Sequence, residues 1–113
     1  MNKRVVITGL GVVAPNGVGL PAFTNAIKKG ISGIKHDAEL ERLQFSCQIA
    51  GKPEVSTELS LHYFTELELR NFNSSGILYG VIAGIDAWKD AGLPIEINDE
   101  PDWNSGTIFG TGT

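Results

Sequence analysis

The sequence lacks the features that mark several common protein classes. Cys47 is the only cysteine in 113 residues, so no internal disulfide can form and a reducing cytoplasm is the expected compartment. No basic cluster is longer than a pair such as Lys28-Lys29, and the net charge is −4, which argues against nucleic acid as a partner. No apolar run approaches the roughly 18 residues that a membrane span needs.

Side chains that carry chemistry are equally sparse. His36 and His62 lie in polar, irregular stretches without a spaced ligand partner, so we expect solvated histidines and no metal site. Cys47 stands between Phe45 and Ile49 in an alternating stretch, which predicts a side chain that fills the core and not a nucleophile. The acidic residues show no paired-carboxylate pattern and are expected on solvated faces: Glu39, Glu41, Glu66 and Glu68.

What is present describes one small globular domain. Hydrophobic residues make up 42% and charged residues 19% of the chain, proportions that separate it from disordered proteins. The 14 glycines cluster where predicted strands meet turns, which indicates tight chain reversals. The basic and then apolar N-terminus is broken by Thr-Gly-Leu-Gly and offers no small-x-small cleavage site, so a signal peptide is not predicted.

The stretch VVITGLGVVAPNG, residues 5–17, contains Gly9-x-Gly11-x-x-Ala14 after an apolar run. This pattern matches the outline of a dinucleotide-binding turn, but a lone match is weak evidence. The glycines of such a turn must open a helix that faces the pyrophosphate. Here two valines follow Gly11, and Pro15 disfavours a helix at the preceding residue. We therefore expect a kinked or bulged strand that ends in a Pro-Asn-Gly turn, and no nucleotide cofactor.

The remaining pattern predicts alternating strands and helices. Apolar spacing predicts an amphipathic helix over residues 20–29, which Gly30 ends, and a small-residue helix over residues 73–91. The small residues of the second helix would let another backbone approach closely. Strands are expected over residues 3–13, 45–51 and 106–110, whereas residues 52–72 allow no clear assignment. The order strand, helix, strand, helix, strand indicates an α/β layered domain.

The predicted strand over residues 106–110 is unusually apolar for its place in the chain. Such a strand normally lies inside a sheet with a neighbour on each side. We therefore interpret residues 1–113 as part of a longer domain.

Four blocks of the sequence resemble a known family. KRVVITGLGVVAPNG, AFTNAIKKGISGI, YGVIAGIDAWKDAGL and GTIFGTGT are similar, in this order, to the N-terminal part of a β-ketoacyl-(acyl-carrier-protein) synthase of the synthase II type. The resemblance implies a thiolase-like fold, of which residues 1–113 would be an incomplete first half. It also implies decarboxylative Claisen condensation in fatty-acid or polyketide synthesis, with a cysteine nucleophile and two histidines that lie beyond Thr113. The chain alone is therefore expected to be inactive.

The resemblance places one part of a binding site in this chain. In the family, the glycine turn after the last strand lines the mouth of the acyl pocket, and the matching residues here are Gly110, Thr111, Gly112 and Thr113. Thr113 stands where the family has a bulky apolar gate residue, which suggests a wider or more polar pocket. The alternative is a tight turn without a ligand role.

The resemblance also implies partners. Acyl-carrier protein is the expected macromolecular partner, together with a second synthase subunit in a homodimer or heterodimer. The family often places basic residues before the long helix to bind the acidic carrier protein. Here Arg70 is the only positive charge in TELELRNFNSSG, so docking through this segment is expected to be weak.

Three function classes remain open from the sequence. The first is the N-terminal part of a catalytic condensing enzyme. The second is a chain-length-factor-like partner, which shares the fold but lacks the nucleophile. The third is an unrelated small α/β binding domain, against which the four ordered blocks argue.

Overall fold

The computed structural model describes residues 2–95 and 99–110. Within these ranges the elements follow in the order β1 (Val13–Ala14), β2 (Gly17–Val18), α1 (Leu20–Lys28), β3 (Ile34–His36), α2 (Ala38–Arg42), β4 (Ile49–Gly51), α3 (Thr57–Leu61), α4 (Glu66–Leu69) and α5 (Ser75–Asp90). Helices and short strands are mixed along the chain, as an α/β protein requires.

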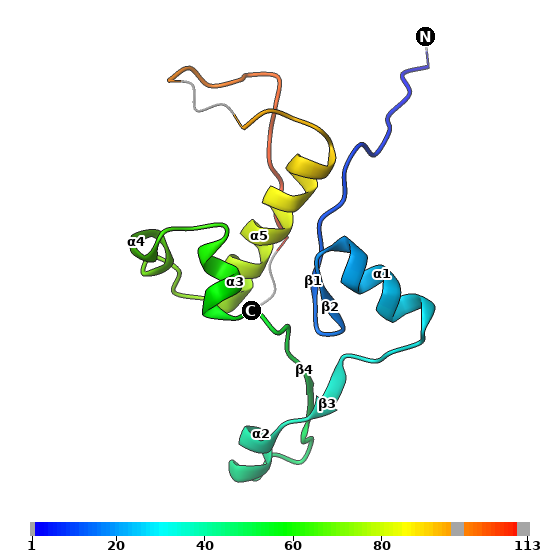
Figure 1. Ribbon diagram of the computed structural model, residues 1–113, viewed down its shortest axis with the longest axis vertical. Helices are drawn as coiled ribbons and strands as arrows, with labels where there is room; N and C mark the ends of the chain where they lie inside the picture. The colour runs from blue at the N-terminus through cyan, green and yellow to red at the C-terminus, as the bar shows by residue number, and fades with distance from the viewer. Residues whose placement is uncertain (1, 96–98, 111–113) are drawn as a thin grey trace.

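A two-stranded hairpin occupies the centre of the molecule. Strands β1 and β2 pair antiparallel, with Val13 opposite Val18, across the turn that begins at Pro15. Helix α1 packs on β2 and helix α5 packs on β1, so the hairpin lies between the two helices (Figure 1). The Pro-Asn-Gly turn predicted from the sequence is therefore confirmed.

Helix α1 begins and ends where the sequence predicts. Pro21 occupies the first turn, where its missing N–H costs no helical hydrogen bond. At the other end, Gly30 adopts a positive φ of 65°, and the N–H of Ile31 donates to the carbonyl of Ala26 at 2.9 Å. This closure satisfies a carbonyl that the helix end would otherwise leave free. Ala26 is buried against the hairpin side of the molecule.

Two short helices, α3 and α4, form in the region where the sequence pattern gave no assignment. Each begins at a hydroxyl that accepts a backbone N–H: Ser56 from Leu59 at 3.0 Å, and Thr65 from Glu68 at 3.3 Å. The Glu68 carboxylate in turn accepts the N–H of Thr65 at 2.8 Å, which completes a capping box. These hydrogen bonds from Thr65 lower the pKa of the Glu68 carboxyl.

The N-terminal segment packs closely against the small residues of α5. A Cβ built at Gly11 would overlap the carbonyl of Ala83, and one built at Gly9 would overlap the carbonyl of Ala87. Only glycine allows the two backbones to lie so close. The contact is fixed by the N–H of Leu10, which donates to Asp90 Oδ2 at 2.9 Å. The predicted close approach to this helix is therefore confirmed.

A polar link holds the end of α3 against α5. The hydroxyl of Tyr63 lies 3.0 and 3.1 Å from the two carboxylate oxygens of Asp86, and Lys89 Nζ lies 5.2 Å from the centre of the Tyr63 ring. Partial burial, together with the hydrogen bond to Asp86, raises the pKa of the Tyr63 hydroxyl. The ring centroids of Phe64 and Phe72 lie 5.0 Å apart, with the ring planes tilted by 58°. Tyr63 thus connects the end of α3 to α5 through Asp86 and Lys89.

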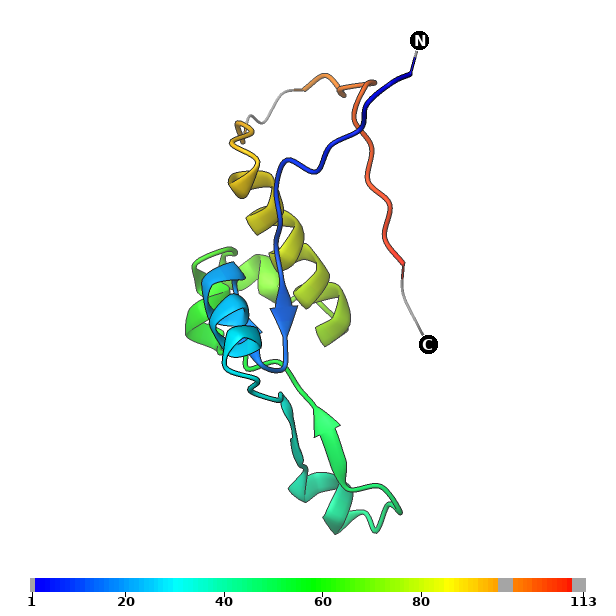
Figure 2. The ribbon, with the colours of Figure 1, turned by 90° about the vertical axis from the view of Figure 1, so that its right-hand side faces the viewer.

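Residues 34–51 form an arm that projects away from the rest of the molecule (Figure 2). Strands β3 and β4 pair antiparallel within it, with His36 opposite Ile49. Helix α2 joins them and is capped by Asp37, whose carboxylate accepts the N–H groups of Glu39 and Leu40. Lys52 forms an ion pair with Asp37 and lowers the pKa of its carboxyl. Within the described residues, the Asp37 cap and its ion pair with Lys52 stabilise the arm.

Three predicted strands differ from the structure. Residues 3–12 and 106–110 run without strand pairing, and only Ile49–Gly51 of the expected strand over residues 45–51 is paired. The reason is physical: a strand is defined by hydrogen bonds to a neighbour, and these segments have none in the described chain. The prediction that Cys47 fills a core is wrong for this structure, because Cys47 precedes β4 and is exposed.

The core of the described chain is very small. Ala26 and Ile82 are its buried hydrophobic residues. The radius of gyration is 17.2 Å, whereas a compact domain of this length would have about 13 Å. Among the described residues, no helix has the length and apolar character to cross a bilayer. The fold thus leaves much of its apolar surface in solvent, including Val5 at 94% and Ile108 at 100% exposure.

Candidate functional site

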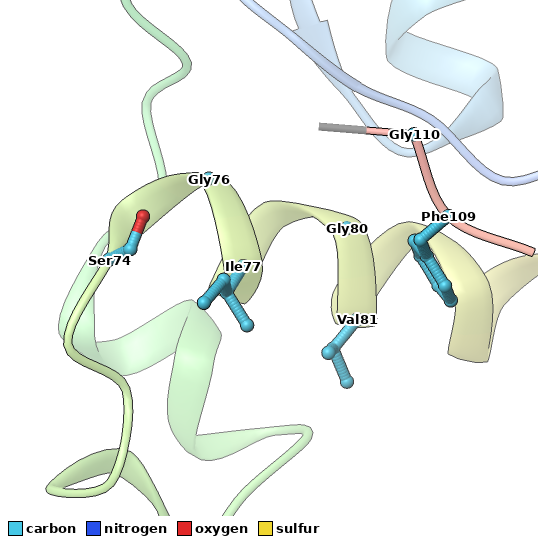
Figure 3. A pocket seen from close by; sticks show the side chains of 7 residues that line it. All are labelled: Ser74, Gly76, Ile77, Gly80, Val81, Phe109 and Gly110. Atoms are coloured by element: carbon cyan, nitrogen blue, oxygen red, sulfur yellow. The ribbon is translucent and has the colours of Figure 1, made fainter. Parts of the chain in front are cut away.

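A largely apolar cavity lies between the first half of α5 and the C-terminal segment. Its volume is about 460 Å³, within the range of small-molecule sites. Figure 3 shows the lining residues along the helix, with Ser74 at one end and Phe109 toward the other. The lining residues are Ser74, Gly76, Ile77, Gly80, Val81, Phe109 and Gly110.

The chemistry of this lining is simple. None of these seven side chains is titratable, so they carry no charge and cannot serve as a general acid or base near neutral pH. Ser74 supplies the only side-chain hydroxyl, and this hydroxyl makes no capping hydrogen bond to α5. Ile77 and Val81 are one helical turn apart and form an aliphatic wall. The described lining therefore has room for an apolar group and supplies no acid or base.

Phe109 is held by two glycines of α5. A Cβ at Gly80 would lie 3.4 Å from Phe109 Cε1, and one at Gly84 would lie 3.7 Å from Phe109 Cζ. The ring therefore rests where larger side chains would project from the helix. Since Phe109 is still 60% exposed, this contact fixes the ring on one side only.

The structure places part of the predicted pocket mouth at this cavity. Gly110 lines it, whereas Thr111, Gly112 and Thr113 lie outside the described residues. Arg70, the predicted carrier-protein contact, is exposed directly after α4 and its acidic residues Glu66 and Glu68. The cavity and the predicted docking residue therefore belong to different parts of the fold.

The sequence's other chemically active side chains do not form a catalytic group. Cys47 Sγ lies 3.8 Å from the carbonyl oxygen of Ile49, and among the described residues it makes no hydrogen bond to a histidine. His36 Nε2 lies 3.4 Å from Glu41 Oε2, and His62 caps the end of α3. Both histidines are exposed, which confirms that they are solvated.

The glycines of the N-terminal motif serve packing in this structure. No helix begins at Gly11: the chain enters β1, and α1 begins at Leu20. Both Gly9 and Gly11 face the backbone of α5, where a nucleotide phosphate would have no room. The arrangement thus differs from that of a dinucleotide-binding turn, in which the second glycine opens the helix that faces the ligand.

Sequence reasoning identified the small residues of α5 but did not assign them to a cavity. The available signal was the spacing of Gly76, Gly80 and Gly84, which repeats every four residues and leaves one helix face without side chains. That spacing predicts close approach by another group, but it does not identify the group. Phe109 comes from a segment distant in sequence, so its position could not be predicted from the local pattern.

Comparison with known proteins identifies the same family that the four sequence blocks resemble. Residues 2–113 match the family described as Beta-ketoacyl synthase, N-terminal domain. The chain is 33% identical over 110 residues to 3-oxoacyl-(acyl-carrier-protein) synthase 2 of Vibrio cholerae, and 34% identical over 112 residues to the Vibrio harveyi protein of the same name. It is 30% identical over 111 residues to a Streptomyces halstedii protein whose name places it among polyketide β-ketoacyl synthases.

These matches cover nearly all of this chain but only part of each relative. They take in 97% of this chain for each Vibrio protein and 98% for the Streptomyces protein, but 25% of the relative in all three cases. The chain thus spans about a quarter of the length of the curated relatives it matches.

Proposed function

We infer the function of this chain from its family. The chain belongs to the β-ketoacyl synthase family, because it matches the N-terminal domain of that family. Membership implies a thiolase-like fold and a role in fatty-acid or polyketide synthesis. We propose that residues 1–113 form the N-terminal part of a condensing enzyme that extends an acyl chain with malonyl-carrier protein. The match over residues 2–113 is the observation that carries this proposal.

The cavity at α5 would receive the acyl chain in this function. Its lining is uncharged and largely aliphatic or aromatic, as a hydrocarbon chain requires. Gly110, which the family resemblance assigns to the pocket mouth, lies in its wall. The family resemblance assigns Thr111, Gly112 and Thr113 to the same pocket mouth, and these residues lie outside the described ranges. The nucleophilic cysteine and the two histidines would come from residues outside this chain.

The exposed apolar segments support the proposal of an incomplete domain. Residues 5–12 and 106–110 include exposed apolar side chains and have no strand partner among the described residues. In a thiolase-like sheet each would gain neighbouring strands and bury those side chains. We propose that, when the rest of the sheet is present, these segments form the first and the last strand of the strand–helix–strand–helix–strand order along the chain.

Carrier-protein docking would depend only weakly on the segment before α5. Arg70 is exposed, but α4 presents Glu66 and Glu68 beside it. An acidic carrier protein would meet repulsion as well as attraction at this surface. We propose acyl-carrier protein as the partner and place most of the docking affinity on other parts of the complete enzyme.

The chain alone is expected to show no condensing activity. The cavity offers no acid or base, and Cys47 has no hydrogen-bonded base among the described residues. The measurement is release of carbon dioxide from malonyl-carrier protein in the presence of acyl-carrier protein. Turnover by the wild-type chain that disappears in Cys47→Ala would contradict the proposal.

A chimaera tests the function directly. Residues 2–113 replace the matched segment of the Vibrio cholerae synthase 2, with the native Vibrio protein as the positive control. If this chain supplies the same structural part, the folded chimaera dimerises and condenses acyl and malonyl groups at a measurable rate. A chimaera that folds and binds acyl-carrier protein but never takes up an acyl chain would argue against the proposed pocket.

The second candidate function is a chain-length-factor-like subunit that pairs with an active synthase. Two departures from the family pattern leave room for it: Thr113 stands where the family has a bulky apolar gate, and Arg70 is the only positive charge in TELELRNFNSSG, the segment before α5. The gene sequence downstream of Thr113 separates the candidates. A Thr-Ala-Cys motif supports the enzyme, whereas another residue in place of that cysteine supports the partner subunit.

A further inference from the structure

Residues 56–72, here called the strap, follow β4, precede α5 and contain both α3 and α4. Their backbone hydrogen bonds stay inside the strap: the N–H of Ser60 donates to the carbonyl of Ser56, and the N–H of Leu69 donates to that of Thr65, each at 3.0 Å. In the described part of the chain, no backbone hydrogen bond of the strap reaches another element. The backbone of the strap is therefore self-contained.

One side-chain hydrogen bond joins the strap to the rest of the described chain. The hydroxyl of Tyr63 lies 3.0 and 3.1 Å from the two carboxylate oxygens of Asp86, where α3 lies beside α5 (Figure 1). Lys89, on the next turn of α5, has its Nζ 5.2 Å from the centre of the Tyr63 ring, within the range of a cation–π contact. The hydroxyl is partly buried and donates to a charged group, which makes this a strong kind of hydrogen bond.

Contacts inside the strap couple its two helices to this link. Phe64 precedes α4 and Phe72 follows it, and their ring centroids are 5.0 Å apart. The ring of Phe64 in turn lies 6.3 Å from that of Tyr63. Helices α3 and α4 have five and four residues, too few to persist in water without tertiary packing. Loss of the link at Tyr63 should therefore affect both helices together.

We propose that the strap opens and closes on α5 as one unit, and that the hydrogen bond between Tyr63 and Asp86 holds it closed. Opening is a local unfolding event, in which α3 and α4 lose their structure while α1 and α5 stay folded. Glu66 and Arg70 belong to the strap, so the same hydrogen bond sets where these charges lie relative to α5. The inference goes beyond the proposed function and does not rest on it, because every contact that it uses lies within residues 56–89.

Amide hydrogen exchange, followed residue by residue by NMR, measures this opening. Four forms of the chain are compared in dilute solution at neutral pH: the wild type, Tyr63→Phe, Asp86→Asn and the control Tyr79→Phe. Tyr79 is the other of the two tyrosines of the chain and lies on α5. Both phenylalanine variants remove one hydroxyl and keep the ring, so they differ in whether the removed hydroxyl donates to Asp86.

In Tyr63→Phe we expect the amides of Ser60 and Leu69 to exchange about tenfold faster and by the same factor, because a hydrogen bond to a charged group is lost. Asp86→Asn should have a smaller effect of the same pattern, since the amide oxygen still accepts the hydroxyl proton but carries no charge. Amides of α1, and all amides of Tyr79→Phe, should keep their wild-type rates. Unchanged exchange in Tyr63→Phe, unequal factors in α3 and α4, or an equal increase in α1 would each overturn the proposal.

Titration of Tyr63 gives a second readout. Partial burial and the hydrogen bond to Asp86 raise the pKa of the Tyr63 hydroxyl, and Lys89 is the other charged group of α5 that faces this ring. Because the closed strap holds this proton more tightly, the contact stabilises the closed state below pH ~10, the ordinary pKa of tyrosine, and this stabilisation is lost as the pH rises through the raised pKa. In a Tyr79→Phe background, phenolate absorbance reports on Tyr63 alone. Adding Asp86→Asn should bring the titration back toward the ordinary pKa of tyrosine, whereas a titration that Asp86→Asn leaves unchanged would show that Asp86 does not hold the strap.

Discussion

Replacing Gly11 with valine is expected to release the N-terminal segment from α5 and to lower the free energy of unfolding by at least about 1–3 kcal/mol, the range for overpacking a well-packed contact. The added Cβ would overlap the carbonyl of Ala83 and crowd the backbone N of Ala87 at 2.7 Å. Both obstacles are helix backbone, which cannot move aside as a flexible side chain could. The segment must therefore separate from the helix and lose the hydrogen bond from Leu10 to Asp90.

Urea unfolding followed by tryptophan fluorescence in a Trp103→Phe background measures this effect, because Trp88 lies on the same helix. Gly106→Val is the matched control, since a Cβ at Gly106 would meet nothing within 4 Å and its φ is not in the left-handed region. Equal unfolding midpoints for Gly11→Val and Gly106→Val would contradict the packing role of Gly11. Amide exchange at Leu10, faster in Gly11→Val alone, would locate the change.

The isolated chain is expected to associate with itself as its concentration rises. Val5, Ile7 and Ile108 are 94%, 84% and 100% exposed, and the backbone around them has no strand partner. Unpaired apolar segments of this kind recruit another chain, because pairing satisfies the backbone and removes apolar surface from water. Dimers, larger assemblies or poor solubility are the expected outcomes.

Light scattering over a dilution series measures this association. The double variant Val5→Lys with Ile108→Lys should remain monomeric to higher concentration, because charges on exposed segments oppose pairing. A monodisperse wild-type monomer with slowly exchanging amides throughout residues 106–110 would show instead that the chain closes its own sheet. In that case the interpretation of this chain as an incomplete domain would be wrong.

Helices were predicted well from the sequence because their hydrogen bonds are local. The apolar spacing, Pro21 and Gly30 together defined α1, and the apolar run before Gly92 defined α5. The short helices α3 and α4 lie in a stretch that the pattern left unassigned, as a possible mixture of short helical turns and loop, although Thr65 and Glu68 show the spacing of a capping box. Their few apolar residues gave no helical period long enough to be recognised.

Strands were predicted less well because their partners are distant in sequence. The alternation of Phe45, Cys47 and Ile49 satisfies the pattern of a half-buried strand, but no layer of the described chain covers this part of the arm. The same limit applies to the cavity. Its helical wall follows a glycine repeat visible in the sequence, whereas the contact of Phe109 with Gly80 joins residues that are 29 positions apart.

The hydrogen bond between Leu10 and Asp90 has a consequence for synthesis on the ribosome. The two residues are separated by 80 positions, so the N-terminal segment leaves the exit tunnel long before the helix that receives it. At 5–20 residues per second, the interval is roughly 4–16 s. During that time Gly9, Leu10 and Gly11 lack the helix backbone and the Asp90 carboxylate that they contact in the folded chain.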